Sequence, residues 1–387
     1  MAEIDVAYPT TASEPRFRLL ELPPDLCKLV ESSPEDFSLT IKGSDGEDAV
    51  LCTSEKTYTI RSVVLSNAVL VLTPPPAPDS LAGMDLDDLS PRAEIQESLH
   101  EILELTPTVP KLHRLRRMLR GMEWDEGQEE GDAESDDGDN QSRRKRVSYD
   151  QVKSELQASD REIERAIRDY HILIVSGALR PIAPTYLHTI LELLLTYLVA
   201  LSQPHDAASV AELTSALESE HDVRREVALQ VMQWFGEVNG AQGEQLWSMD
   251  VPGVVRQVGL GLLRNHRDTP VPESAFLESW RAAVGDVFVT EVNMRLLAGN
   301  YLSAPAPLSI SPDTEPQLTY FPRSELPTEP SARFTDLFLT RVRWKATDIA
   351  PFLDDIAVDS KDRDKLLLKY ARAVTESDGL WYTARSR

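Results

Sequence analysis

Four basic residues near the C-terminus have the spacing of phosphate ligands on one face of a helix. They recur at steps of four, four and three, at Lys361, Lys365, Lys369 and Arg372. On an α-helix that spacing places all four side chains on one stripe. A cationic stripe on a short helix can contact the phosphates of a nucleic acid. The alternative is an ordinary solvated helix face, because charged residues lie on the outside of most helices.

The charge of the surrounding chain sets this stripe apart. The protein carries a formal net charge of -24, whereas residues 331–387 hold 11 Lys and Arg against 9 Asp and Glu. A dedicated DNA-binding domain is usually more basic than this, so we expect weak phosphate contacts that are independent of sequence. The other basic side chains that we predict to take part in DNA binding are Arg341, Arg343, Lys345, Arg363 and Arg385.

The composition indicates a folded protein of two or three domains. The chain has 387 residues, of which 41% are hydrophobic, and this is ample for packed cores. Its most apolar stretch, Leu187–Leu201, contains His188 and Glu192 and is too short and too polar to span a bilayer. We therefore expect a buried core helix there. Residues Met1–Tyr8 lack the basic and apolar regions of a secretory signal.

No residue pattern predicts a catalytic or metal site. The two cysteines, Cys27 and Cys52, form neither a disulfide framework nor a metal-binding spacing, and none of the seven histidines has another within four residues. The sequence has no GxxxxGK[ST] phosphate loop, no GxGxxG fingerprint and no GxSxG nucleophile elbow. We therefore predict a non-enzymatic protein without cofactor or metal, in the cytosol or the nucleus.

The first hundred residues have the pattern of β structure. Apolar and polar residues alternate in Phe37–Lys42 and Lys56–Arg61, and compact apolar runs occur at Ala49–Thr53 and Ala68–Leu72. Turn residues between them indicate a meander of short strands. Further elements predicted here are strands at Arg16–Glu21 and Leu99–Leu105 and a short helix at Asp25–Glu31.

The predicted sheet has an unprotected edge. A sheet of a few short strands either closes on itself or needs a partner, and few charges protect Val63–Leu72. We therefore predict an α+β protein whose N-terminal, β-barrel-like subdomain is completed by partner subunits. The side chains that we expect to bind the partner are Val50, Leu51, Tyr58, Ile60, Val69 and Val71.

An acidic tract separates the β region from the rest of the chain. Glu123–Asp139 holds ten acidic residues and no basic one, and the basic tetrad Arg143–Arg146 follows it. The tract cannot bury enough apolar surface to order itself, so we predict a disordered linker or an acidic loop. The tetrad is either a nuclear import signal or phosphate contact, or it neutralises the acidic run.

From Tyr149 onward the pattern is helical and repeats at intervals of about 60 residues. Capping boxes begin helices at Ser159–Glu162 and Ser209–Glu212, whereas Gln245–Ser248 has the pattern of a short strand and Val254–Leu263 that of a closing helix. Such units fit tandem winged-helix domains. They can equally be protein-docking modules, which suits the first two, acidic copies better.

The last copy is the clearest. Phe334–Thr340 has a helical pattern, Thr347 caps a short helix, and Ser360 caps the helix that carries the cationic stripe. Leu380–Thr383 supplies a wing-like strand. This arrangement makes the cationic helix the predicted recognition helix.

Particular residues at both ends of the chain resemble one protein family. In the N-terminal part these are Ala49–Thr53, Lys56–Tyr58 and Ser66–Asn67. Towards the C-terminus they are Tyr320–Pro322, Glu325–Pro327, Arg333–Phe334, Trp344, Asp348–Phe352 and Leu367–Tyr370. They resemble the signatures of the Dcc family (defective in sister chromatid cohesion), accessory subunits of the alternative clamp loader linked to chromosome transmission fidelity. The order agrees at both ends, although the acidic tract matches no family motif.

The resemblance implies a fold and a set of partners. The family's N-terminal region forms a β-barrel assembly with the small third subunit and the C-terminal tail of the large, ATP-hydrolysing subunit. Its C-terminal region is a string of winged helices that contact single- and double-stranded DNA, and the accessory module docks on DNA polymerase epsilon. The parent complex loads and unloads the sliding clamp in the nucleus and supports cohesion and checkpoint signalling. The ATPase motifs lie on another subunit, in agreement with their absence here.

We therefore predict a non-catalytic nuclear scaffold in five parts. They are a β-barrel subdomain at 1–105, a helix and acidic linker at 106–148, and winged helices at 149–205, 206–270 and 271–387. The rival interpretation is a winged-helix transcriptional regulator whose last module reads a specific sequence. A dimerising sheet with palindromic targets would favour the regulator, and a stable assembly with two other subunits would favour the scaffold.

Overall fold

The computed structural model describes residues 5–7, 17–32, 38–43, 46–72, 92–127, 146–241, 244–304 and 315–385. The protein is a mixed α+β structure, as predicted, and divides into two compact units. Unit 1 comprises Met1–Pro110 and Gln157–Arg161, and unit 2 comprises Lys111–Leu156 and Glu162–Arg387. Most of the predicted acidic tract and the first three residues of the basic tetrad lie outside the described residues.

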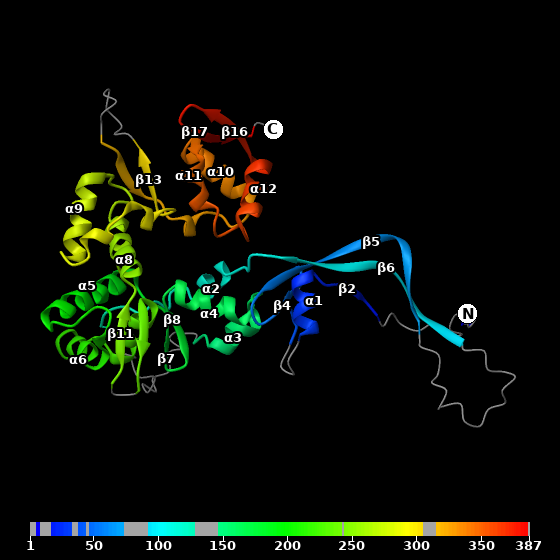
Figure 1. The fold of residues 1–387 in the computed structure, drawn as a ribbon, viewed down its shortest axis with the longest axis horizontal. Coiled ribbons are helices and arrows are strands. Elements are labelled where there is room, and N and C mark those ends of the chain that lie inside the picture. Colours follow the sequence, from blue (N-terminus) through cyan, green and yellow to red (C-terminus); the bar gives the residue numbers. More distant parts are fainter. Residues whose placement is uncertain are drawn as a thin grey trace, which may run out of the picture. The chain divides into compact units, whose positions relative to one another are not determined.

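Unit 1 is built on an open sheet of six strands (Figure 1). The strand order is β1-β6-β5-β4-β3, and β2 also pairs with β6. Strands β1 and β2 run parallel to β6, and the other pairs are antiparallel. The elements are β1 (Asp5–Ala7), β2 (Leu19–Glu21), α1 (Pro24–Glu31), β3 (Thr40–Lys42), β4 (Val50–Cys52), β5 (Thr57–Leu72) and β6 (Arg92–Pro107).

The predicted meander of short strands is wrong for β5 and β6, whereas completion of a barrel-like sheet by partner subunits stays a prediction. The sheet does not close, because β1 and β3 at its two ends do not pair with each other. The two strands predicted at Lys56–Arg61 and Ala68–Leu72 are one 16-residue strand, β5. No glycine or proline interrupts β5, so its pairing with the equally long β6 continues.

The ribbon of β5 and β6 has an irregular register and an open edge. Val64 lies opposite Glu101, whereas Val69 lies opposite Leu99, so four residues of β5 face one of β6. Such a bulge interrupts the ladder and bends the strand. Beyond Thr59, β6 is the only neighbour of β5 among the described strands. The other edge of β5 is therefore unpaired over most of its length in the described chain.

A segment far along the sequence completes unit 1. Four side chains form a small core between α1 and the sheet, namely Leu26, Leu51, Tyr58 and Leu105. Beside it, the Ser159 N–H donates a hydrogen bond to Thr57 Oγ1 at 3.0 Å, and Lys42 Nζ donates to the Ala158 carbonyl at 2.7 Å. The predicted subdomain 1–105 therefore leaves out residues that belong to this unit.

Unit 2 repeats one chain path four times. Each copy runs helix, strand, helix, helix, strand, strand, except that two 3-10 turns replace the last helix of the third copy, and the first two strands both pair with the third. In repeat 1 the first strand is a single bridge between Ser148 and Ala178. We call these copies repeats 1 to 4.

The elements of the repeats follow in chain order (Figure 1). Repeat 1 has α2 (His113–Met118), α3 (Tyr149–Glu155), α4 (Asp160–Asp169), β7 (Ile172–Val175) and β8 (Ala178–Pro181). Repeat 2 has α5 (Pro184–Ala200), β9 (Ala208–Ser209), α6 (Val210–His221), α7 (Arg225–Trp234), β10 (Gly236–Asn239) and β11 (Leu246–Met249). Repeat 3 has α8 (Val251–Arg264), β12 (Val271–Pro272), α9 (Glu273–Val284), the 3-10 turns η3 (Val289–Glu291) and η4 (Met294–Leu297), β13 (Tyr301–Ala304) and β14 (Gln317–Tyr320). After η5 (Arg323–Glu325), repeat 4 has α10 (Pro330–Thr340), β15 (Arg343–Lys345), α11 (Ala346–Ile349), η6 (Ala350–Phe352), α12 (Ser360–Tyr370), β16 (Ala371–Glu376) and β17 (Gly379–Ala384).

These repeats do not coincide with the predicted modules 149–205, 206–270 and 271–387. A boundary at 205 separates α5 from the strands and helices of its own repeat. Repeat 3 has two short 3-10 turns where the other copies have a third α-helix. Repeat 1 is interrupted between α2 and Ser148 by the acidic tract.

Two cores hold unit 2 together. Repeats 1 to 3 share one buried cluster that extends from Trp124 to Leu318, and repeat 4 has its own cluster around Phe334 and Trp344. The apolar stretch Leu187–Leu201 forms most of α5 and is a buried core helix, as predicted. In the part of the chain that is described, no helix has the length and apolarity needed to cross a membrane.

His171 connects α4 to β7 in a left-handed conformation, with φ of 50°. Its ring stacks on Phe235 with centroids 5.2 Å apart and tilts against Trp234. Burial, with smaller contributions from Arg256 and Arg264, lowers the pKa of His171 from 6.5 to about 3. The folded protein therefore keeps this ring neutral, whereas the unfolded chain protonates it below about pH 6.5.

We expect this difference to destabilise unit 2 in mild acid. The folded-state pKa is depressed, so stability is fully present above pH 6.5 and falls as the pH drops towards 3, by about 2 kcal/mol between pH 7 and pH 5. His171→Asn tolerates the left-handed backbone but cannot titrate, and should show a shallower pH dependence. Denaturant midpoints followed by tryptophan fluorescence at several pH values measure this. Equal slopes for the two proteins would contradict it.

Candidate nucleic-acid interface

The cationic stripe lies on a shorter helix than the sequence pattern predicts. Asp359, not Ser360, caps α12, because its side chain accepts a hydrogen bond from the Asp362 N–H at 2.8 Å. The helix ends at Tyr370. Arg385 Nη1 donates to the carbonyl oxygens of Leu368 and Lys369 at 2.9 and 3.3 Å and so satisfies the exposed helix end.

The placement of Arg372 on the cationic helix is a wrong prediction. Arg372 lies on strand β16, which pairs with β17 from Ala371 to Glu376. Continuous pairing along the hairpin outweighs the helical period of four residues. The signal that could have shown this is the Asp378–Gly379 pair between two β-prone runs, which is typical of a tight hairpin turn.

Two lysines on α12 are available to a ligand. Lys361 and Lys365 are exposed and have no hydrogen bond or ion pair with any described residue. Lys369 is also exposed, and its ammonium lies 5.0 Å from the centre of the Tyr370 ring. Arg363, in contrast, pairs with Asp354 at 3.1 Å. The stripe thus presents three separate ammonium groups at helical spacing.

A second group of basic side chains lies on the β15-β17-β16 sheet. Arg343, Thr383 and Arg372 form one row across the strands, and Lys345, Trp381 and Val374 form the next. Side chains alternate along a strand, so these two rows share one face. The other face carries Trp344 and Tyr382, which pack in the core of repeat 4. We call the face with Trp381 the outer sheet face.

Acidic residues of the β16–β17 hairpin engage part of this face. Arg343 pairs with Glu376, and Lys345 pairs with Asp378 at 3.5 Å. The Trp381 indole N–H donates to Asp378 at 2.8 Å and lowers the pKa of its carboxyl group, with Lys345 contributing. The Arg372 side chain is exposed and has no hydrogen bond or ion pair within the described chain.

Two further predicted DNA ligands have structural roles. Arg341 lies 4.8 Å from the Trp344 ring centre, is 3.8 Å from Asp348, and donates to the Ser303 carbonyl. Arg385 caps α12, as described above. It also lines a shallow groove with the following residues: Leu368, Ala371 and Arg372.

The arrangement has the chemistry to bind phosphates. Among the residues that the structure describes, no three His, Cys, Asp or Glu side chains converge on a metal position. Ammonium and guanidinium groups on a helix and a neighbouring sheet suit a polyanion, because each can pair with one phosphate.

The side chains predicted to bind a partner in unit 1 fall into two groups. Val50, Leu51 and Tyr58 are buried in the unit itself, with Leu51 and Tyr58 in its core. Ile60 and Val71 are half-buried, and Val69 is exposed. Of these six residues, only Ile60, Val69 and Val71 have side chains that a partner can reach, and all three lie on the long strand β5.

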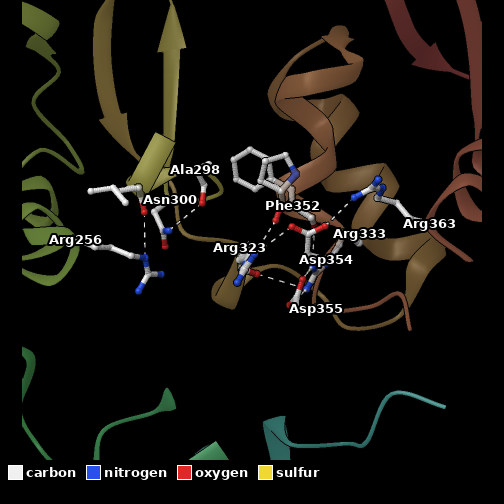
Figure 2. Close-up of polar contacts among 11 residues, drawn as sticks. Arg256, Ala298, Asn300, Arg323, Arg333, Phe352, Asp354, Asp355 and Arg363 are labelled. Atoms are coloured by element: carbon white, nitrogen blue, oxygen red, sulfur yellow. Dashed lines mark hydrogen bonds and ion pairs between the residues drawn. The ribbon is translucent and has the colours of Figure 1, made fainter. Parts of the chain in front are cut away.

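A buried arginine fixes the frame that carries both cationic surfaces (Figure 2). Arg333 of α10 is 0% exposed and forms an ion pair with Asp355, with 3.0 Å between Nη2 and Oδ2. Its guanidinium also donates to the carbonyl oxygens of Pro327 and Phe352 at 2.6 and 2.8 Å and to that of Leu326 at 3.3 Å. Sequence reasoning singled out Arg333 only as part of a resemblance, because nothing in a sequence marks a charged residue as buried.

Partly exposed ion pairs continue this network towards α12 (Figure 2). Arg323 donates to the Pro351 carbonyl at 3.2 Å and lies 3.7 Å from Asp354, the partner of Arg363. On the side of repeat 3, Arg256 donates to the Leu296 carbonyl at 3.1 Å. The start of α12 is thus tied to the segment that precedes α10.

Comparison with known proteins gives the family. Residues 17–353 match the family described as sister chromatid cohesion protein Dcc1. The chain belongs to this family. The human sister chromatid cohesion protein DCC1 is 26% identical over 372 residues, which cover 95% of this chain and 88% of the relative. A probable DCC1 of Dictyostelium discoideum is 25% identical, with 96% and 93% covered, and the Saccharomyces cerevisiae protein is 21% identical, with 93% and 94% covered.

The residues that match the Dcc1 family end before most residues of the α12 stripe and the outer sheet face. The match stops at residue 353, whereas α12, β16 and β17 follow from Ser360. The interpretation of these elements as a nucleic-acid interface therefore depends on their own residues. The match does include Arg333 and the strand β15.

Removing one partner of the Arg333–Asp355 pair should unfold repeat 4 locally. Asp355→Ala leaves a guanidinium that cannot lose its charge, and we expect a loss of about 3–5 kcal/mol. The double variant Arg333→Met/Asp355→Leu removes both charges and should cost less. Hydrogen exchange of α10 and α12 measures the opening free energy. Arg363→Met, at a partly exposed pair, is the control and should cost about 1 kcal/mol or less. A double variant worse than Asp355→Ala would contradict this view.

Proposed function

We propose that this chain is a non-catalytic accessory subunit of a nuclear, alternative clamp loader of the chromosome transmission fidelity type. In this role it acts in loading and unloading of the sliding clamp, in sister chromatid cohesion and in the replication checkpoint. The observation that carries the proposal is membership of the Dcc1 family over residues 17–353, with relatives named for sister chromatid cohesion.

The open edge of unit 1 supports assembly with other subunits. Beyond Thr59 one edge of β5 has no described neighbour, and Val64 is 80% exposed there. Val69, Leu70 and Leu72 are also exposed. An unpaired strand edge with apolar side chains invites another strand. We propose that the small third subunit and the C-terminal tail of the large ATPase subunit complete this sheet into a barrel.

Lysines on β5 should prevent this assembly. In Val64→Lys/Leu70→Lys the two new charges lose their hydration when a partner covers the strand, so the three-chain complex should not form on co-expression. Val199→Lys, at a residue of α5 that is 66% exposed, is the matched control and should assemble normally. A stable complex with the β5 variant would exclude this edge as the interface. A chain that forms only homodimers and selects palindromic DNA would favour the transcriptional regulator instead.

The path of the repeats supports the winged-helix part of the proposal. In a winged helix the third strand lies between the first and second, and the last helix precedes the wing hairpin. The order β15-β17-β16, with α12 directly before β16, fits this description, and the sheets of repeats 2 and 3 have the same order. We infer that α12 is the recognition helix, and that repeats 1 to 3 dock proteins, DNA polymerase epsilon among them.

The cationic stripe supports a DNA contact that does not depend on sequence. Lys361 and Lys365 are exposed, lie about one helical turn apart and have no carboxylate partner among the described residues, so both are available to a polyanion. Phosphate contacts position a protein without reading bases, so binding should be similar for unrelated sequences.

Removing two lysines should flatten the salt dependence of DNA binding. For full-length Lys361→Ala/Lys365→Ala, the slope of log K against log salt should fall by about 0.9 per lost contact on duplex and about 0.7 on single strands. Arg363→Ala removes one charge that is already paired with Asp354 and is the control. Fluorescence anisotropy at three salt concentrations measures the slope. Unchanged slopes with an intact fold would make the stripe a solvated helix face.

A further inference from the structure

We propose that the outer sheet face of repeat 4 is a stacking platform for an unpaired base of single-stranded nucleic acid, with Trp381 at its centre. This inference rests on the proposed DNA contact. It goes further, because it adds a second surface beside α12 and names the strand state that this surface prefers.

Trp381 differs from the other tryptophans in its surroundings. Four of the six are at most 3% exposed and belong to cores: Trp124, Trp247, Trp280 and Trp344. Trp381 is half-buried, lies outside the core of repeat 4, and points to the opposite face of the sheet from Trp344. Its indole N–H is held by Asp378 at 2.8 Å, which fixes the ring on a rigid strand. A flat ring held in this way is ready to receive a base.

Cations surround this ring. The Arg343 guanidinium carbon is 5.0 Å and the Lys345 ammonium 5.8 Å from the ring centre. Arg372 lies in the row next to that of Trp381, which it shares with Arg343 and Thr383, and its side chain is unpaired within the described chain. A base can stack on the indole or on the guanidinium plane that covers it, while Arg372 pairs with the adjoining phosphate. Aromatic and cationic groups of this kind track a single strand.

The same face disfavours duplex DNA. In a duplex the bases stack on one another and their flat faces are not accessible to Trp381. The ordinary alternative is a surface cation–π pair, in which Arg343 and Trp381 only stabilise the hairpin.

Three full-length proteins separate these interpretations. The wild type, Trp381→Phe and Trp381→Leu are titrated with a labelled oligothymidylate of about 30 nucleotides, long enough for several contacts, and with a duplex of equal length. We expect Trp381→Leu to bind the oligothymidylate about fivefold or more weakly and to bind duplex within about twofold of wild type. Trp381→Phe keeps an aromatic face and should bind nearly as the wild type does.

Tryptophan fluorescence provides a second measurement, which would not change if Trp381 only stabilised the hairpin. Oligothymidylate should quench the wild-type tryptophan emission, and Trp381→Phe should bind with much of that quenching lost, because stacking brings a base onto this one indole. Equal binding and equal quenching by all three proteins would overturn the inference. So would quenching by an acidic peptide but not by oligothymidylate, which would make the face a protein-docking site.

The stripe variant distinguishes failure of this inference from failure of the proposed DNA contact. If Lys361→Ala/Lys365→Ala loses DNA binding while Trp381→Leu does not, the platform is excluded and the DNA contact of α12 stands. If Trp381→Leu loses single-strand binding while the stripe variant retains it, the platform is supported and the contact of α12 is excluded.

Discussion

The surface of repeat 4 depends on one buried charge. Removing a guanidinium from water is costly unless its donors find acceptors in the protein. Arg333 finds them in Asp355 and in backbone carbonyls on both sides of α10, at Pro327 and Phe352. These bonds hold irregular segments in one conformation, and those segments set where α12 begins. Hydrophobic packing alone would not select this geometry, because it has no preferred direction.

The structure separates basic side chains that stabilise the fold from those that remain available. The sequence provides nine candidates, and five of them are engaged within the chain: Arg341, Arg343, Lys345, Arg363 and Arg385. The others lie on two surfaces, the α12 stripe and the outer sheet face. A count of charges cannot make this distinction, since pairing depends on which carboxylate the fold brings near. The net charge of the C-terminal region is small because it contains similar numbers of basic and acidic side chains. The basic side chains that stay unpaired within the described chain are nevertheless grouped on the α12 stripe and the outer sheet face.

Short sequence patterns predicted a helix or strand well where interactions within the same segment determine its structure. The cap at Ser209, the helix over Val254–Leu263 and the strand at Gln245–Ser248 all have close counterparts in the structure. The errors arise where strand pairing decides. Arg372 fits a helix by spacing but pairs in a hairpin, and β5 continues because β6 does. Repeat 3 has two 3-10 turns in place of a third helix, so its likeness to the other repeats is visible only in the strand order. The burial of Arg333 has no local signature at all.

Because Gln157–Arg161 belong to unit 1, this unit cannot complete its fold early in synthesis on the ribosome. A ribosome makes the N-terminal residues first, and domains generally fold as units while the chain is still growing. Unit 1 cannot do so when Pro110 is made, because the hydrogen bonds from Ser159 to Thr57 and from Lys42 to Ala158 must wait until the acidic tract and α3 have been synthesised. At about 5–20 residues per second this delay lasts several seconds. During that time the long strands β5 and β6 exist without their full fold, so a nascent chain has an interval in which a chaperone or an assembly partner can reach them first.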